Sequence, residues 1–200
     1  MLQRARRDTI SPVPKSAAAA AVSIRSAEPD DAFAISQLLG LTGVFEWLLH
    51  LPDMPVASRV EFLQRMDPQG CRLVAVADGQ IVAMAGLHVQ QPGLRRSHVR
   101  SLVLAVAPGW QGHGLGRELL TRLLSWADRW GGVLRIELWV HEGNERAIAL
   151  YREFGFVQEG RHTSYALMDG RYVDTLSMAR LHPDQPRVSG VSSAARKTAG

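Results

Sequence analysis

The sequence has a single cysteine, Cys71, so no disulfide bond within the chain can hold the fold together. Cys71 opens an apolar run, which favours a small buried side chain over a nucleophile. No apolar run approaches the ~18 residues that a membrane span needs. No histidine or cysteine spacing is typical of a metal site. We therefore expect a cytoplasmic protein with no metal and no membrane association.

The sequence also lacks the basic body of a folded nucleic-acid-binding protein. The formal net charge of the 200 residues is +4, of which residues 1–21 supply +3 and residues 183–200 supply +2. Residues 22–182 therefore carry −1. Both ends are too poor in large apolar residues to form a core. We expect a disordered leader at 1–21, one domain at 22–182, a disordered tail at 183–200 and no nucleic-acid partner. Nucleic-acid binding through the two ends is the alternative, and it predicts salt-sensitive binding.

The sequence does contain an alternation of strand and helix patterns. Strands are expected at 22–25, 71–77, 80–89, 98–106, 133–140, 156–167 and 171–181, and helices at 29–39, 56–66, 115–130 and 144–154. Leucines recur at helical spacing in 115–130, which makes this helix amphipathic. Asp-Gly pairs at 78–79 and 169–170 predict two hairpins. This alternation predicts an α/β fold with a mixed sheet flanked by helices.

The strongest motif is the run Gln111-Gly112-His113-Gly114-Leu115-Gly116, which lies between a strand and the long helix. Alternate glycines let the backbone turn tightly and approach a ligand without interference from Cβ atoms. The N–H groups of such a loop converge at the positive end of the helix, which predicts a phosphate site. No Gly-Lys-Ser/Thr occurs, and the third glycine of a dinucleotide fingerprint is absent.

A second motif joins Asn144 to Tyr151. The two residues are seven positions apart, so they share one face of the predicted helix. Asn144 follows a strand, where its amide can cap the helix or hold an amide of a ligand. Tyr151 alone would be interpreted as a packed aromatic residue. Its combination with Asn144 and the glycine loop favours a functional role instead.

Five features stand in a fixed order along the chain: strand 102–106, the loop 111–116, Asn144, Tyr151 and the turn 154–156. Over residues 22–181, this combination resembles the GNAT family of N-acetyltransferases. The resemblance implies an α/β (α+β) fold whose mostly antiparallel central sheet has about seven strands and about four flanking helices, and is splayed at the acyl-CoA site. It also implies a homodimer that transfers the acetyl group of acetyl-CoA directly to the primary amine of a small acceptor.

The resemblance further implies a role for each site residue. Tyr151 is the expected catalytic acid, which protonates the departing thiolate. Main-chain groups of strand 102–106 would hold the pantetheine arm and the thioester oxygen. The loop and the helix start would hold the pyrophosphate. Asn144 would form a hydrogen bond with the pantetheine. The expected cofactor-binding residues are Leu104, Ala105, Val106, Gln111, Gly112, His113, Gly114, Leu115, Gly116, Arg117 and Asn144.

The acceptor is suggested by a narrower resemblance. Residues 95–99, 135–138, 170–174 and 178–180 resemble the bacterial branch of the family that acetylates L-phenylalanine and L-methionine. A free L-amino acid of this kind is therefore the first expectation. The alternatives are a polyamine, an antibiotic amine, a protein N-terminus, or a module that binds acyl-CoA without turnover. The Asn144/Tyr151 pair argues against the last, because a module without catalysis needs no proton donor.

Other residues have open interpretations. Glu137 is either a base for the incoming amine or part of a structural salt bridge, and a water chain could equally take the proton. Trp47 fits a continued helix, a dimer contact or a wall of the acceptor pocket. Glu46 could attract the acceptor's ammonium group. Trp139 lies in a predicted strand and is expected to pack in the core or at an edge.

Overall fold

The structure is a computed structural model that describes residues 21–49, 51, 55, 57, 60, 63–64, 70–89 and 94–184. The predicted leader and tail lie outside the described residues, apart from Ala21, Pro183 and Asp184. Most of the helix predicted at 56–66 also lies outside them. The four positions described within that stretch, 57, 60, 63 and 64, are helical.

One mixed sheet of seven strands forms the centre of the described structure, in the order β1-β2-β3-β4-β5-β7-β6. The strands are β1 (Val22–Ser26), β2 (Cys71–Ala77), β3 (Gln80–His88), β4 (Val99–Val106), β5 (Arg135–His141), β6 (Val157–Met168) and β7 (Arg171–Leu181). Only the β4–β5 pair is parallel. The mostly antiparallel seven-stranded sheet expected from the sequence is confirmed.

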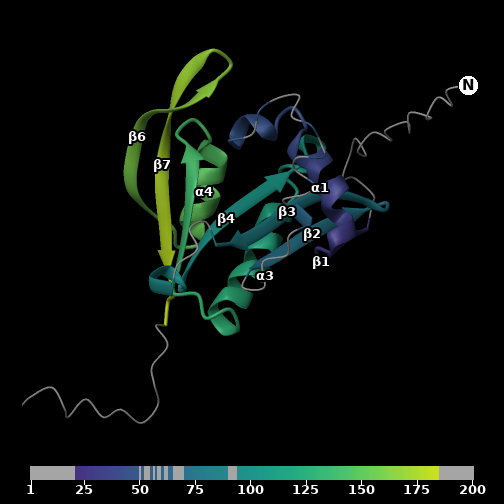
Figure 1. The fold of residues 1–200 in the computed structure, drawn as a ribbon, viewed down its shortest axis with the longest axis horizontal. Coiled ribbons are helices and arrows are strands. Elements are labelled where there is room, and N and C mark those ends of the chain that lie inside the picture. Colours follow the sequence, from purple (N-terminus) through teal and green to yellow (C-terminus); the bar gives the residue numbers. More distant parts are fainter. Residues whose placement is uncertain are drawn as a thin grey trace, which may run out of the picture.

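The β4–β5 pair is short. It joins residues 99–101 to residues 135–137, whereas β3 stays paired with β4 as far as Val106. Beyond Ser101, therefore, β4 has a strand neighbour on one side only. Figure 1 shows the consequence: β5, β6 and β7 run at a steep angle to β2, β3 and β4. This divergence is the splay that the resemblance implied.

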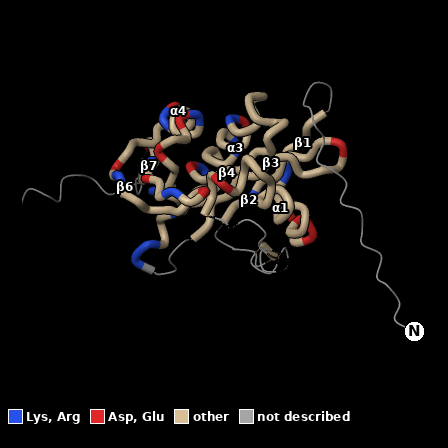
Figure 2. The backbone as a smooth tube through the Cα atoms, turned by 90° about the horizontal axis from the view of Figure 1, so that it is seen from above, with Lys and Arg blue, Asp and Glu red and all other residues tan. Residues whose placement is uncertain are grey.

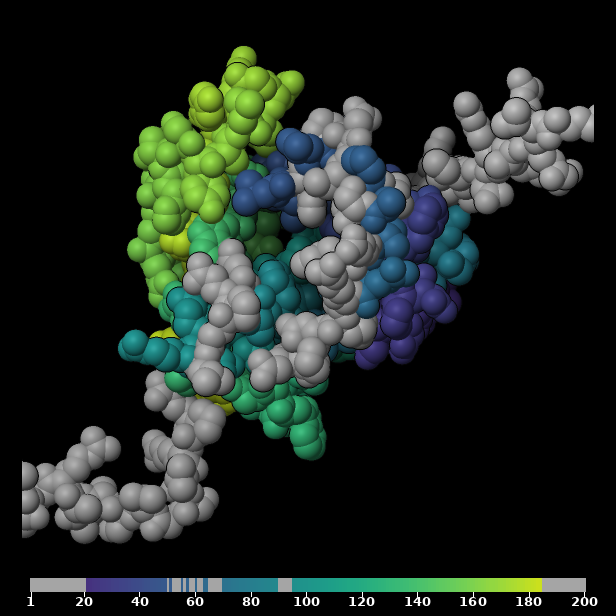
Figure 3. Space-filling view, in the orientation of Figure 1, coloured from purple at the N-terminus to yellow at the C-terminus, as the bar shows by residue number. Residues whose placement is uncertain are grey.

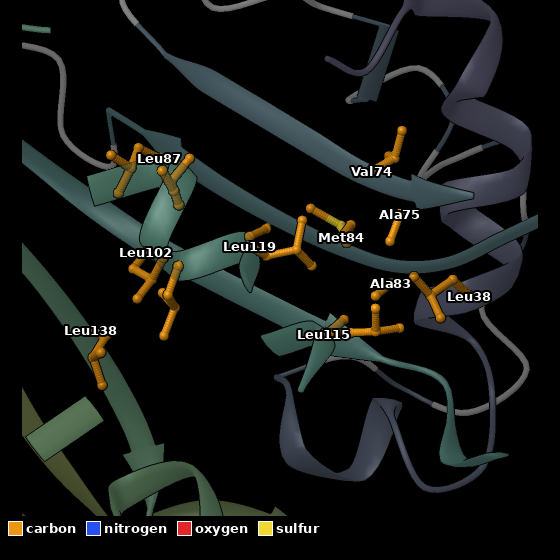
Figure 4. Packing of buried hydrophobic residues seen from close by; sticks show 14 of the residues in the cluster. Leu38, Val74, Ala75, Ala83, Met84, Leu87, Leu102, Leu115, Leu119 and Leu138 are labelled. Carbon is orange, nitrogen blue, oxygen red and sulfur yellow. The ribbon is translucent and has the colours of Figure 1, made fainter. Parts of the chain in front are cut away.

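Three helices cover the sheet in the described residues: α1 (Ala32–Leu39), α3 (Leu115–Arg129) and α4 (Glu145–Glu153). Figures 1 and 2 show α3 and α4 on one face and α1 on the other. The apolar face of α3 is fully buried, with Leu119, Leu120 and Leu123 at 0% exposure. Leu115 and Leu119 of α3, labelled in Figure 4, belong to the same buried cluster as Ala83 of β3 and Leu102 of β4.

The two Asp-Gly hairpins form as predicted. Asp78 and Gly79 join β2 to β3 with φ of 49° and 76°, and Asp169 and Gly170 join β6 to β7 with φ of 48° and 73°. Two successive residues with positive φ match the right-handed twist of the flanking strands. Figure 2 shows arginines interspersed with acidic residues along the described chain.

Candidate active site

A cleft of about 530 Å³ opens where β4 and β5 diverge. Its walls come from five places: the segment after α1, strand β4, the glycine loop with the start of α3, the end of β5, and α4. The residues that line the cleft include Gly43, Trp47, Leu104, Val106, Gln111, Gly112, Gly114, Arg117, Trp139, Asn144, Arg146, Tyr151 and Glu153. In Figure 3, the blue segment that contains Trp47 lies near the yellow-green β6–β7 hairpin.

Strand β4 presents backbone groups to this cleft. Ala107 donates its N–H to Val82 of β3 at 2.9 Å, so its polar groups face β3. Because successive residues of a strand point their N–H and C=O groups to opposite edges, those of Leu104 and Val106 face the cleft. The carbonyl of Val106 indeed accepts a hydrogen bond from the Gln111 side chain at 2.9 Å. By the same alternation, the backbone of Ala105 faces β3.

The glycine loop leaves open space next to unpaired N–H groups. Gly112 and Gly114 have φ of 84° and 83°, and a Cβ at either would meet nothing within 4 Å. Gly114 is the N-cap of α3, and the first backbone bond of that helix runs from Glu118 to Gly114 at 3.0 Å. The N–H groups of residues 115–117 therefore have no partner within the helix. This loop is a cradle that fits the pyrophosphate of acetyl-CoA.

At Gly116, the missing side chain makes room for packing between elements and not for a ligand. A Cβ on Gly116 would lie 3.4 Å from Leu150 and 3.6 Å from Leu104. The glycine thus lets α3 pack closely between α4 and β4. Of the three glycines in the motif, two leave room for a ligand and the third leaves room for packing.

Two arginines flank the cradle. Arg117 forms a two-point ion pair with Glu153, which raises the pKa of the arginine and lowers that of the glutamate. The positive charge expected from Arg117 is therefore offset by Glu153. Arg146 lines the same cleft, and its Nη1 donates to Oε1 of Gln111 at 3.2 Å. Sequence reasoning missed Arg146, although its place in the first turn of the helix after Asn144 was a usable signal.

Asn144 combines the two roles left open by the sequence. Its Oδ1 accepts a hydrogen bond from the backbone N–H of Ala147 at 3.2 Å, which caps α4. Its side chain also lines the cleft, and the cap leaves the amide NH₂ free of that bond. Capping fixes the direction of the amide, so the donor is pre-oriented toward the cleft.

Tyr151 lies on the same face of α4 and is 8% exposed. Gly155, with a φ of 83°, ends α4 and turns the chain so that the ring of Phe156 lies 5.8 Å from the ring of Tyr151. Burial raises the pKa of Tyr151 to about 12. The hydroxyl is therefore neutral at neutral pH, and it can donate a hydrogen bond or a proton.

The structure brings together nearly all the predicted site residues. Tyr151, Asn144 and every predicted cofactor-binding residue except His113 line the cleft. The His113 side chain is exposed, and its Nδ1 lies 2.9 Å from the carbonyl of Gln111. His113 thus does not line the cleft, and its backbone N–H is the contact with the pyrophosphate that stays predicted.

The other end of the cleft is aromatic. Trp47 belongs to a short 3-10 helix (Phe45–Trp47) and is 39% exposed, and Trp139 of β5 is 36% exposed. Both line the cleft. Of the two places expected for Trp139, the core is excluded by its exposure and the edge fits, because β5 loses β4 as a neighbour before this position. The ring of His141 is buried, and its Nδ1 is hydrogen-bonded to the hydroxyl of Thr175. The centroid of this ring lies 6.4 Å from the centroid of the Trp47 ring.

Neither candidate carboxylate faces the cleft. Glu137 accepts hydrogen bonds from Arg96 at 2.7 Å and from Arg135 at 3.3 Å, at the paired part of β5. Its interpretation as a structural salt bridge is therefore the one that the structure supports. Oε2 of Glu46 accepts the backbone N–H of Gly43 at 2.5 Å and closes a turn instead.

Comparison with known proteins agrees with this geometry. The model of the acetyltransferase (GNAT) family matches residues 41–156. The L-amino acid N-acetyltransferase AaaT of Escherichia coli (strain K12) is 37% identical over 161 residues, which are 80% of this chain and 98% of that protein. The chain belongs to the GNAT acetyltransferase family. GNAT enzymes use acetyl-CoA, so it is an acetyl-CoA-dependent N-acetyltransferase.

Two further relatives bear on the fold and the acceptor. The spermidine N(1)-acetyltransferase of Vibrio cholerae is 36% identical over 75 residues, 38% of this chain and 45% of that protein. The structure of the Salmonella typhimurium yncA protein with acetyl-CoA has a TM-score of 0.72 at 20% identity, covering 85% of this chain and 99% of that chain.

The described helices were also compared with the length and hydropathy of a membrane span, and none of them meets both requirements.

The raised pKa of Tyr151 predicts a pH-dependent stability. The folded state favours the neutral phenol, so this contribution is complete below the ordinary pKa of 10.0 and is lost as pH rises through about 12. We expect the unfolding free energy of the wild type to fall by roughly 2 kcal/mol relative to Tyr151→Phe between about pH 9 and about pH 12. Urea denaturation across this range measures it. A constant difference between the two proteins would contradict burial of the phenol.

Proposed function

We propose that this enzyme acetylates the α-amino group of a free L-amino acid with an apolar side chain, such as phenylalanine or methionine. The observation that carries the proposal is the charge of the cleft. Among the described lining residues, the one carboxylate is Glu153, and it is paired with Arg117. A polyamine is a polycation and needs carboxylates along its path, whereas an amino acid carries one carboxylate of its own.

The aromatic end of the cleft supports the same acceptor. Trp47 and Trp139 present large apolar surfaces of the kind that bury an apolar side chain. The full-length similarity to AaaT, an L-amino acid N-acetyltransferase, points in this direction as well. The similarity to the spermidine enzyme covers less than half of that protein. A protein N-terminus or an antibiotic amine is the alternative acceptor.

In the proposed complex, the chain holds acetyl-CoA mainly with backbone groups. N–H groups of residues 112–117 bind the pyrophosphate, and Arg146 adds positive charge there. Leu104 and Val106 pair with the pantetheine arm much as a neighbouring strand would, and the amide of Asn144 donates to it. An N–H group at this edge of β4 stabilises the negative oxygen that develops when the amine attacks the thioester. Holding both reactants in contact removes much of the entropic cost of the reaction.

Tyr151 supplies the proton that the departing sulfur needs. A phenol with a pKa of about 12 would not protonate a thiolate in water, where a thiol has a pKa near ~8.5. The apolar surroundings that raise the pKa of Tyr151 also raise that of a thiolate beside it, which favours transfer within the cleft. As the N–C bond forms and the C–S bond breaks, the attacking amine loses its own proton to water, since none of the described lining residues is a histidine or an unpaired carboxylate. Water then returns a proton to the Tyr151 oxygen, so the enzyme ends in its starting state.

The domain limits, the cytoplasmic location and the homodimer expected from the sequence stay part of this proposal. On the β6–β7 hairpin, Leu167 and Tyr172 lie opposite each other and are 64% and 72% exposed. Such an apolar pair supports an interface, because burying it would remove apolar surface from water.

The acceptor is tested by thiol release from acetyl-CoA with a panel of amines. The panel contains L-phenylalanine, L-methionine, spermidine, an aminoglycoside and a peptide with a free N-terminus. We expect release with the two amino acids and little with spermidine, because the cleft lacks unpaired carboxylates. Turnover of spermidine without turnover of either amino acid would refute the proposal.

The glycine loop is tested with a matched pair of variants. Gly114→Val places a side chain in the open cradle, and we expect acetyl-CoA affinity to fall by about tenfold or more because backbone donors lose the phosphate. Gly79→Val carries the same positive-φ strain at the β2–β3 turn, also with open space around it. Calorimetric titration should show wild-type affinity for Gly79→Val. Equal affinities of the two variants would show that Gly114 does not face the cofactor.

The acid is tested with Tyr151→Phe. We expect kcat to fall by about 10²–10⁴-fold while acetyl-CoA affinity stays unchanged, because only the proton donor is removed. Tyr172→Phe, at a residue that is 72% exposed, serves as the control and should leave kcat unchanged. Steady-state kinetics with the best amine of the panel give both values. Near-normal kcat for Tyr151→Phe would remove it from this role.

A further inference from the structure

We infer that the side chain of Gln111 is a positioning residue for the acceptor, a role that goes beyond the contact of its loop with the cofactor. Its amide joins the cofactor-binding strand to the segment that carries Trp47, and so sets the aromatic wall of the cleft. The inference rests on the proposed function, because it assumes that Trp47 contacts the acceptor.

Gln111 lies where three walls of the cleft meet. Its Nε2 donates to the carbonyl of Val106 at 2.9 Å and lies 3.5 Å from the carbonyl of Gly43. Its Oε1 accepts from Arg146 at 3.2 Å. One neutral side chain therefore links the end of β4, the segment after α1 and the first turn of α4.

A second contact docks the same segment onto the approach to the glycine loop. Gly43 has a φ of 83°, and a Cβ built on it would lie 3.0 Å from Cγ of Pro108. A side chain at this position would require Pro108 to shift by a few tenths of an ångström, and the positive φ also favours glycine. The carbonyl of Gly43 is thereby held within reach of the Gln111 amide, three residues further along the chain from Pro108.

Hydrogen bonds within residues 43–47 couple the position of Gly43 to that of Trp47. Glu46 accepts the N–H of Gly43 at 2.5 Å, and the N–H of Trp47 donates to Val44 at 3.1 Å. Val44 is 4% exposed and anchors the turn in the core. A shift of Gly43 relative to β4 would therefore move the indole of Trp47 relative to the cleft.

The cofactor does not depend on this side chain in the same way. The expected pyrophosphate donors are backbone N–H groups of the loop, and their direction follows from the positive φ of Gly112 and Gly114. Removing the amide of Gln111 leaves those groups in place. The inference therefore predicts a split, in which the acceptor is affected and acetyl-CoA is not.

The test uses Gln111→Met, which keeps the length of the side chain, adds no charge and removes both hydrogen-bonding functions. We expect the KM for L-phenylalanine to rise by about tenfold, as the loss of one to two hydrogen bonds allows. The dissociation constant of acetyl-CoA, measured by calorimetry, should change by less than about threefold. An unchanged acceptor KM, or equal losses for both substrates, would overturn the inference.

A double-mutant cycle with Trp47→Ala separates positioning from a general loss of structure. If Gln111 acts through Trp47, then Gln111→Met should raise the acceptor KM in the wild-type background and leave it unchanged in the Trp47→Ala background. Additive effects would refute the link. The measurements also distinguish the two proposals. If the wild type acetylates L-phenylalanine but Gln111→Met leaves the acceptor KM unchanged, this inference alone is refuted. If the wild type does not acetylate amino acids, both proposals are overturned.

Discussion

The parting of β4 from β5 is the constraint on which the rest of this structure depends. The two strands pair over three residues each, and beyond Ser101 the backbone of β4 has a free edge inside the molecule. Polar backbone groups in such a place need partners. The pantetheine arm of acetyl-CoA carries amides that can meet this need, which is why we propose the break in the sheet as the cofactor site. The loop 111–116, Asn144 and Tyr151 are all placed around that break.

The cleft is positive without a basic protein surface. Residues 22–182 carry a formal charge of −1, and Arg117 is offset by Glu153. Attraction for a pyrophosphate comes instead from N–H groups at the start of α3 and from Arg146. Because these donors are local, they bind one anionic group and would give little affinity for a long polyanion. Among the described lining residues, no carboxylate is unpaired, which favours an amino acid over a polyamine as the proposed acceptor.

In the proposed complex, two different kinds of group hold the two substrates. Backbone groups, whose direction is set by glycines of positive φ, face the cofactor. The proposed acceptor half is made of side chains, chiefly Trp47 and Trp139. The amide of Gln111 bridges the halves. This division fits a family in which the acyl donor is shared and the acceptor varies.

The sequence by itself determined the features that depend on neighbouring residues: the Asp-Gly hairpins, the amphipathic α3, the glycine loop before it, and the shared face of Asn144 and Tyr151. These follow from local φ preferences and from the helical repeat, which act over a few residues. Tertiary structure alone decided where a strand loses its partner. That decision exposes Trp139 to the cleft, ties Glu137 to Arg96 and Arg135, and brings Gln111 to Gly43, 68 residues away in sequence. Such contacts depend on sheet register and on the packing of distant segments, which no local pattern encodes.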